Sequence, residues 1–104
     1  MKLRNIILAV LAVISMSSCK SQYELLLTGN DADAKYKAAF EYFNNKKYSR
    51  AATLFESLAA LTDGTDRDDT VRFYWGLSNY KFKDYYTAET NFQQFYESYP
   101  RSPF

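Results

Sequence analysis

The sequence predicts an all-α protein, an α-solenoid of two helix-turn-helix repeats that follow a lipoprotein signal peptide. Two observations lead to this prediction. The first residues combine cations, an apolar run and the only cysteine of the chain. The remaining residues repeat a pattern of small, aromatic and apolar side chains at an offset of 37 residues, with apolar residues three or four apart as on one face of a helix.

The N-terminal segment, residues 1–18, is typical of a bacterial lipoprotein signal peptide. Two cations precede nine uncharged apolar residues, which are too few to span a bilayer permanently. Two small residues then lead to Cys19 in a pattern that resembles a lipobox, although that motif usually carries Leu where this chain has Met16. We expect Cys19 to be lipidated, because a lone thiol would otherwise stand unpaired in an oxidising compartment. The alternative is an ordinary cleaved signal or an uncleaved anchor.

The composition excludes several classes of function. The chain has no histidine, which removes the usual general base and the commonest metal ligand. Its 13 basic and 12 acidic residues nearly balance, whereas a nucleic-acid-binding protein needs a concentrated basic excess. No Gly-rich phosphate loop occurs, and the loop that begins at Asp63 carries Tyr74 where an EF-hand needs a bidentate carboxylate. We therefore expect no enzyme activity, no cofactor, no metal and no nucleic-acid partner.

The two copies of the repeat align without gaps at the offset of 37 residues. Small residues allow two antiparallel helices to approach closely, tyrosines close the turn inside each copy, and phenylalanines on one face of the second helix fill the groove against its neighbour. The residues expected to pack the repeats are Ala39, Tyr48, Ala51 and Phe55 in the first copy and Gly76, Tyr85, Ala88 and Phe92 in the second.

The elements follow in order along the chain. A linker at residues 19–31 contains a short helix near residues 23–27. The first repeat spans residues 32–68, and the second spans 69–104 and ends in the start of a truncated third. The apolar spacing, interrupted by turn-forming residues, predicts long helices at residues 32–45, 48–61, 69–82 and 85–98. Because about three solenoid units are normally needed for stability, we expect the chain to be a piece of a longer protein.

A stripe of large apolar residues marks the first helix of each repeat. Its three members are spaced by four and then three residues, which places them on one helical face. Two interpretations stay open: the stripe lines an apolar groove that binds a peptide, or it fills the core and packs against a further repeat. The members are Tyr36, Phe40 and Phe43 in the first copy and Phe73, Leu77 and Tyr80 in the second.

Charged residues separate by the kind of turn in which they lie. Lysines gather at the turns inside the repeats, and aspartates gather in the loop between the repeats. These turns belong to opposite edges of the array, so the sequence predicts a basic edge and an acidic edge, either of which could simply be solvated. The residues are Lys46, Lys47, Lys81 and Lys83 on the basic edge and Asp63, Asp66, Asp68 and Asp69 on the acidic edge.

The repeat resembles the tetratricopeptide repeat, a helix-turn-helix unit of about 34 residues that closes with a proline, here Pro100. The lipobox, the short distance from Cys19 to the repeats and the run Tyr-Pro-Arg-Ser-Pro at residues 99–103 make the chain similar to one family. That family is BamD, the lipoprotein of the outer-membrane β-barrel assembly machinery. The resemblance covers the chain but only the first two repeats of the family.

The resemblance implies a function without covalent chemistry. A member of this family is held by a lipid anchor in the outer membrane of Gram-negative bacteria, faces the periplasm, and helps to fold and insert outer-membrane proteins. Its partners are the β-barrel subunit of the machinery and unfolded outer-membrane proteins, which its N-terminal repeats are implicated in contacting.

Two alternatives stay open. The first is another tetratricopeptide lipoprotein that acts as an adaptor in the cell envelope. The second is a lipoprotein that binds a glycan or another small molecule, which would need an exposed Trp or Tyr platform ringed by amides and carboxylates. The only tryptophan, Trp75, lies beside Gly76 at an expected packing position, and this favours a peptide over a glycan.

Overall fold

The computed structural model of the protein describes residues 21–104, so the predictions for the signal peptide and Cys19 lie outside the described residues. This part of the chain forms five helices and no strand, which confirms the all-α prediction. The four long helices begin and end within one residue of their predicted bounds. The helices are α2 (Gln22–Thr28), α3 (Ala32–Asn44), α4 (Tyr48–Thr62), α5 (Asp68–Lys81) and α6 (Tyr85–Ser98).

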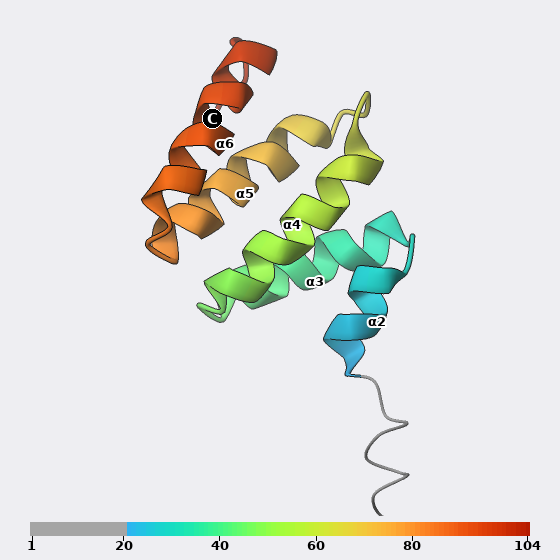
Figure 1. Cartoon of the computed structure of the whole chain (residues 1–104). Helices are drawn as coiled ribbons and strands as arrows, with labels where there is room; N and C mark the ends of the chain where they lie inside the picture. The colour runs from blue at the N-terminus through green and yellow to red at the C-terminus, as the bar shows by residue number, and fades with distance from the viewer. Residues whose placement is uncertain (1–20) are drawn as a thin grey trace, which may run out of the picture.

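Consecutive helices pack against each other in chain order. Figure 1 shows the chain running back and forth from α3 to α6, with each long helix beside the next. The short α2 packs on both α3 and α4. Three helices begin with a side chain that accepts a hydrogen bond from the first turn: Ser21 from Glu24 N, Asp31 from Ala34 N and Asp84 from Thr87 N. Such caps satisfy backbone donors that a helix leaves unpaired at its start.

The core lies where α3, α4 and α5 meet. Leu54, Phe55 and Leu58 of α4 are fully buried there, together with Ala39 and Val71 from the flanking helices. The alanines of the repeat pattern are buried, since Ala39, Ala51 and Ala88 are at most 2% exposed.

Gly76 lies at a close contact between α5 and α6. A Cβ atom at this position would lie 2.9 Å from the Phe92 ring and 3.2 Å from the Asn91 Cβ atom. The absence of a side chain therefore allows the two helices to approach closely at this position.

The turns inside the two repeats have the same geometry. Lys46 and Lys83 have positive φ angles of 62° and 72°. The Lys46 N–H donates to the Phe43 carbonyl oxygen, and the next N–H donates to the carbonyl oxygen of Tyr42. At the offset of 37 residues, Lys83 donates to Tyr80, and Asp84 donates to Asn79. This pair of bonds is the Schellman ending of a helix, in which glycine is the usual residue at the positive-φ position.

An aromatic pair closes each of these turns. The rings of Phe43 and Tyr48 lie 5.3 Å apart, and those of Tyr80 and Tyr85 lie 5.4 Å apart, both edge to face. The two pairs are again 37 residues apart, so the repeat in the sequence is also a repeat in the geometry. Tyr48 is partly covered because Lys81 of α5 lies over its ring, whereas Tyr85 is exposed.

One buried cation joins the start of the described chain to the array. The Lys35 side chain is 3% exposed, and its ammonium donates to the Leu27 carbonyl oxygen and to the Ser57 hydroxyl. It therefore links α3 with the end of α2 and with α4. No residue of α2 is itself fully buried, so this link and the half-buried Tyr23 and Leu26 hold the short helix.

The predicted acidic edge is wrong for one of its four members. Asp68 is fully buried, whereas Asp63 and Asp66 are exposed and Asp69 is half-buried. Asp68 is the first residue of α5, and its carboxylate turns inward to three donors instead of outward to water. The physical reason is that a buried carboxylate with enough hydrogen-bond partners remains charged inside a protein.

Candidate functional site

A row of aromatic rings runs across α3 and α5. Ring centroids lie 4.9 Å apart between Tyr36 and Phe40, 4.7 Å between Phe40 and Tyr74, and 5.5 Å between Tyr74 and Phe73. The ring of Phe104, from the non-helical segment after α6, stacks on Phe73 at 4.8 Å with an interplanar angle of 16°. We call these five residues the aromatic row. Phe104 is 42% exposed and the other four are half-buried, so the row offers partly accessible apolar faces.

The six residues of the predicted groove are distributed over three places. Tyr36 and Phe40 lie in the aromatic row and line an open hollow of about 450 Å³ beside α3. Phe73 lies at the other end of the row, where it also packs on Phe92 and Phe95 of α6. The other three lie outside the row: Phe43 packs on Tyr48 and Tyr74, Leu77 is half-buried, and Tyr80 is 54% exposed beside Tyr85.

Tyr74 joins the two halves of the row, and the sequence analysis missed it. Its ring contacts rings on α3, α4 and α5, and that of Phe104. In the alignment of the two copies, Phe73 falls opposite the aromatic Tyr36, whereas Tyr74 falls opposite Lys37. The predicted stripe therefore contains Phe73 and not Tyr74. The signal that could have found it is the buried stripe of α5 itself, in which Val71, Tyr74 and Ser78 follow helical spacing.

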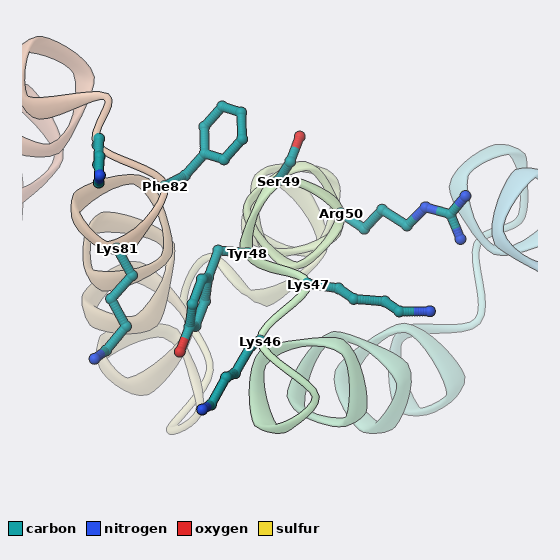
Figure 2. A pocket seen from close by; sticks show the side chains of 8 residues that line it. Lys46, Lys47, Tyr48, Ser49, Arg50, Lys81 and Phe82 are labelled. Atoms are coloured by element: carbon teal, nitrogen blue, oxygen red, sulfur yellow. The ribbon is translucent and has the colours of Figure 1, made fainter.

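A second feature is a hollow of about 500 Å³ between the turns inside the two repeats. Eight residues line it, of which five are cationic and none is acidic. Figure 2 shows the ends of Lys46 and Lys81 near the Tyr48 hydroxyl, while Lys47 and Arg50 extend on the other side. We call this hollow the basic hollow; its lining is Lys46, Lys47, Tyr48, Ser49, Arg50, Lys81, Phe82 and Lys83.

Two of the five cations of the basic hollow have aromatic partners, and none has a carboxylate partner among the described residues. Within residues 21–104 the two ion pairs are those of Arg67 with Asp33 and of Arg72 with Asp68. The Arg50 guanidinium instead lies 5.0 Å from the centre of the Tyr23 ring, and the Lys81 ammonium lies 5.7 Å from that of Tyr48. The positive charge of the hollow is therefore uncompensated by acidic side chains in the described part of the chain.

A buried network at the opposite edge has a structural role. The Asp68 carboxylate accepts hydrogen bonds from the Thr62 hydroxyl at 2.8 Å, from the Arg72 Nε at 2.8 Å and from the Tyr99 hydroxyl. Burial alone would raise the pKa of Asp68, but these donors outweigh it and hold the pKa below its ordinary value. The same bond to Asp68, together with burial, raises the pKa of Tyr99 to about 12. The network thus ties the ends of α4 and α6 to the start of α5.

Trp75 lies away from the aromatic row. It is half-buried against the core and lines a hollow of about 300 Å³ that also contains Glu56, Asn79 and Asp84. The Asn79 side-chain amide is already engaged, because it donates to the Asn91 side-chain oxygen at 2.9 Å. The Trp75 indole therefore lies beside two carboxylates and an amide, as in a glycan-binding platform, but it presents only one face.

No helix among α2 to α6 is long and apolar enough to cross a membrane. Between residues 21 and 104, no group of three or more Cys, Asp or Glu side chains is arranged to hold a metal ion.

Comparison of the chain with protein-family models, with curated proteins and with solved structures finds no match. The class of protein is therefore defined by its fold and surfaces alone. It is an all-helical array of repeated helix pairs, with a row of aromatic rings across its first helices and a basic hollow between its inner turns.

Proposed function

We propose that the chain is a lipid-anchored scaffold of the tetratricopeptide type that binds extended polypeptide along the aromatic row. The observation that carries this proposal is the position of Phe104. A ring from a non-helical segment stacks on Phe73 and contacts Tyr74, so the row accepts an aromatic side chain from outside the helices. Grooves lined by aromatic side chains dock extended peptides in several classes of recognition domain.

The repeated turns support the assignment to the tetratricopeptide type. The same hydrogen bonds, the same positive φ angles and the same ring pairs recur at an offset of 37 residues. Buried small residues at Ala39 and Gly76 provide the close helix contacts that such a repeat needs.

The resemblance to BamD supports a more specific role. On that resemblance the chain is an outer-membrane protein assembly factor, anchored through Cys19 and facing the periplasm. Its partners are the β-barrel subunit of the machinery and unfolded outer-membrane proteins. Outer-membrane strands often end in an aromatic residue, and the aromatic row offers stacking partners for such a ring. A ring pair of this kind contributes about 0.5–1.5 kcal/mol beyond the area that it buries.

The first experiment identifies the partners. The full-length protein is extracted from membranes and pulled down beside a Cys19→Ala control, and the recovered proteins are identified by mass spectrometry. We expect a large outer-membrane β-barrel protein with the wild type, and loss of membrane anchoring with the control. Recovery of a cell-wall enzyme without any barrel protein would contradict the assembly role and favour an envelope adaptor.

The second experiment tests the row itself. A synthetic peptide that ends in Phe is titrated into the purified protein, and the same peptide ending in Ser is the control ligand. We expect Tyr36→Ser to weaken binding of the Phe peptide by about fivefold or more, as truncation of an interface aromatic does. The matched variant is Tyr86→Ser, because Tyr86 is 84% exposed on α6 and lies outside the row. Equal binding by both variants, or equal binding of both peptides, would contradict the proposal.

A second candidate function rests on Trp75. The hollow with Glu56 and Asp84 favours a small glycan over a peptide at that position. Titration with oligosaccharides of the cell wall, followed by Trp75 fluorescence, tests it. A saturable change in emission that Glu56→Gln abolishes would support this candidate, and unchanged emission would exclude it for the sugars used.

A further inference from the structure

The basic hollow lies beside the point where the described chain begins. Gln22 at the start of α2 and Lys47 of the hollow line the same small cavity of about 200 Å³. Tyr23, the next residue, lies under the Arg50 guanidinium. The start of α2 therefore belongs to the same edge of the molecule as the turns inside the two repeats.

This position matters because Cys19 precedes Gln22 by only three residues. At most about 3.6 Å of chain is available per residue, so the Cα atom of Cys19, to which the lipid would be joined through the side chain, stays within about 11 Å of the start of α2. An anchor at Cys19 therefore brings this edge close to the membrane.

The turns themselves carry lysine where the backbone favours glycine. Lys46 and Lys83 occupy the positive-φ position of their Schellman turns, which is unfavourable for a residue with a Cβ atom. Both turns therefore keep a cationic side chain at a strained backbone position. Strain of this kind indicates a functional role for the side chain.

Exposed aromatic side chains lie along the same edge. Phe82 is 56% exposed and Tyr85 is 57% exposed, and the adjacent Tyr86 is more exposed still. Phe82 and Lys83 line the basic hollow, and Tyr85 follows them at the start of α6. Aromatic rings together with Lys and Arg are typical of surfaces that lie at the level of lipid headgroups.

We propose that this edge docks on an anionic membrane surface, with the cations of the basic hollow binding lipid phosphates and the exposed aromatic rings entering the headgroup region. The proposal rests on the lipid anchor of the proposed function. The proposal adds that the array is held in one orientation on the membrane, with the turns inside the two repeats facing the lipid. An acidic peptide would use the cations equally well but would leave the exposed rings without a role.

The test measures which lysines the membrane protects. The mature lipoprotein is reconstituted in vesicles of phosphatidylcholine alone or with phosphatidylglycerol, and lysine acetylation rates are read by mass spectrometry after flotation. We expect Lys46, Lys47, Lys81 and Lys83 to react more slowly on the anionic vesicles, whereas the exposed Lys37 on α3 reacts at the same rate on both. Inorganic phosphate added to the neutral vesicles is the control for a free anion.

A double variant, Lys46→Gly with Lys83→Gly, tests the charges without straining the turns. Each cation near an anionic surface contributes a factor of about five to the affinity. The loss of two cations should therefore weaken docking of the edge by about thirtyfold. The remaining Lys47 and Lys81 should lose most of their protection. The matched control, Lys37→Gln with Arg101→Gln, removes the same charge from exposed positions elsewhere and should leave the protection unchanged.

The outcomes of the test distinguish docking of this edge from anchoring through Cys19. Flotation with both vesicle types but equal acetylation overturns the docked edge and leaves the anchor standing. Flotation only with anionic vesicles, with the four lysines protected, supports the edge and contradicts the anchor. Protection by inorganic phosphate on neutral vesicles, or protection only when an acidic peptide is added, would overturn the assignment to a lipid surface. Equal loss of protection in the two double variants would overturn it as well.

Discussion

Removal of the Tyr99 hydroxyl should destabilise the protein through the buried carboxylate of Asp68. Tyr99 follows α6 and donates to Asp68, the fully buried first residue of α5. In Tyr99→Phe the carboxylate keeps its bonds from Thr62 and Arg72 but loses the third donor. A hydrogen bond to a charged group contributes about 1.5–3 kcal/mol, so we expect the free energy of unfolding at neutral pH to fall by about 2 kcal/mol.

The effect should depend on pH at both ends of the range. The pKa of Asp68 is lowered in the folded state, so its stabilising contribution is present above the ordinary value of 3.8 and is lost as the pH falls through the folded pKa. The pKa of Tyr99 is raised from 10.0 to about 12, so its contribution is present below pH 10.0 and is lost as the pH rises toward 12. The difference between wild type and Tyr99→Phe should therefore shrink in acid and in strong base.

Urea unfolding followed by Trp75 fluorescence measures this difference. The matched control is Tyr96→Phe, because Tyr96 is 62% exposed and makes no side-chain hydrogen bond in the described structure. A surface change of this kind should alter stability by less than about 0.5 kcal/mol. The reasoning is refuted if both variants are equally stable at neutral pH, or if the cost of Tyr99→Phe is the same at every pH.

Three further predictions concern packing and turns. Gly76→Ala should lower the free energy of unfolding by about 1–3 kcal/mol in urea titrations, because the added Cβ meets a Phe ring at 2.9 Å; a gain in stability would show that α5 and α6 separate freely. Lys46→Gly with Lys83→Gly should raise the melting temperature, since glycine relieves about 1 kcal/mol of strain in each turn; a lower value would contradict strained turns. Tyr74→Ala should cost about 3–5 kcal/mol in the same titrations, and the exposed Tyr85→Ala less than about 1 kcal/mol; equal costs would remove Tyr74 from the centre of the array.

The helices could be predicted from the sequence because the signals that define them are local. Apolar residues three and four apart mark one face of each helix, and short polar runs such as residues 44–47 interrupt the pattern. The small residues Ala39 and Gly76 could be predicted as contact points because two antiparallel helices must approach somewhere and the offset of 37 residues repeats the position.

The surfaces were harder to predict because they depend on residues that are distant in sequence. Asp68 lies in a run of aspartates and looks solvated, but its partner Tyr99 follows 31 residues later and turns it into a buried acceptor. The sequence pattern does not distinguish Tyr74 from the adjacent Phe73. Which of the two rings joins the halves of the row depends on how the side chains of α3 and α5 meet. The turn lysines were predicted to share an edge, but the open hollow between them forms only because the two turns lie side by side in the fold.

The loose attachment of α2 has a mechanical consequence. A force applied at the start of the described chain loads this seven-residue helix first, and it has no fully buried residue. The Lys35 ammonium holds the carbonyl oxygen of Leu27 near its end, so the load passes there into α3 and α4. Extension from about 1.5 to about 3.4 Å per residue would release about 13 Å of chain while α3 to α6 stay folded. Unwinding of α2 would therefore lengthen the chain before the load reaches α3 to α6.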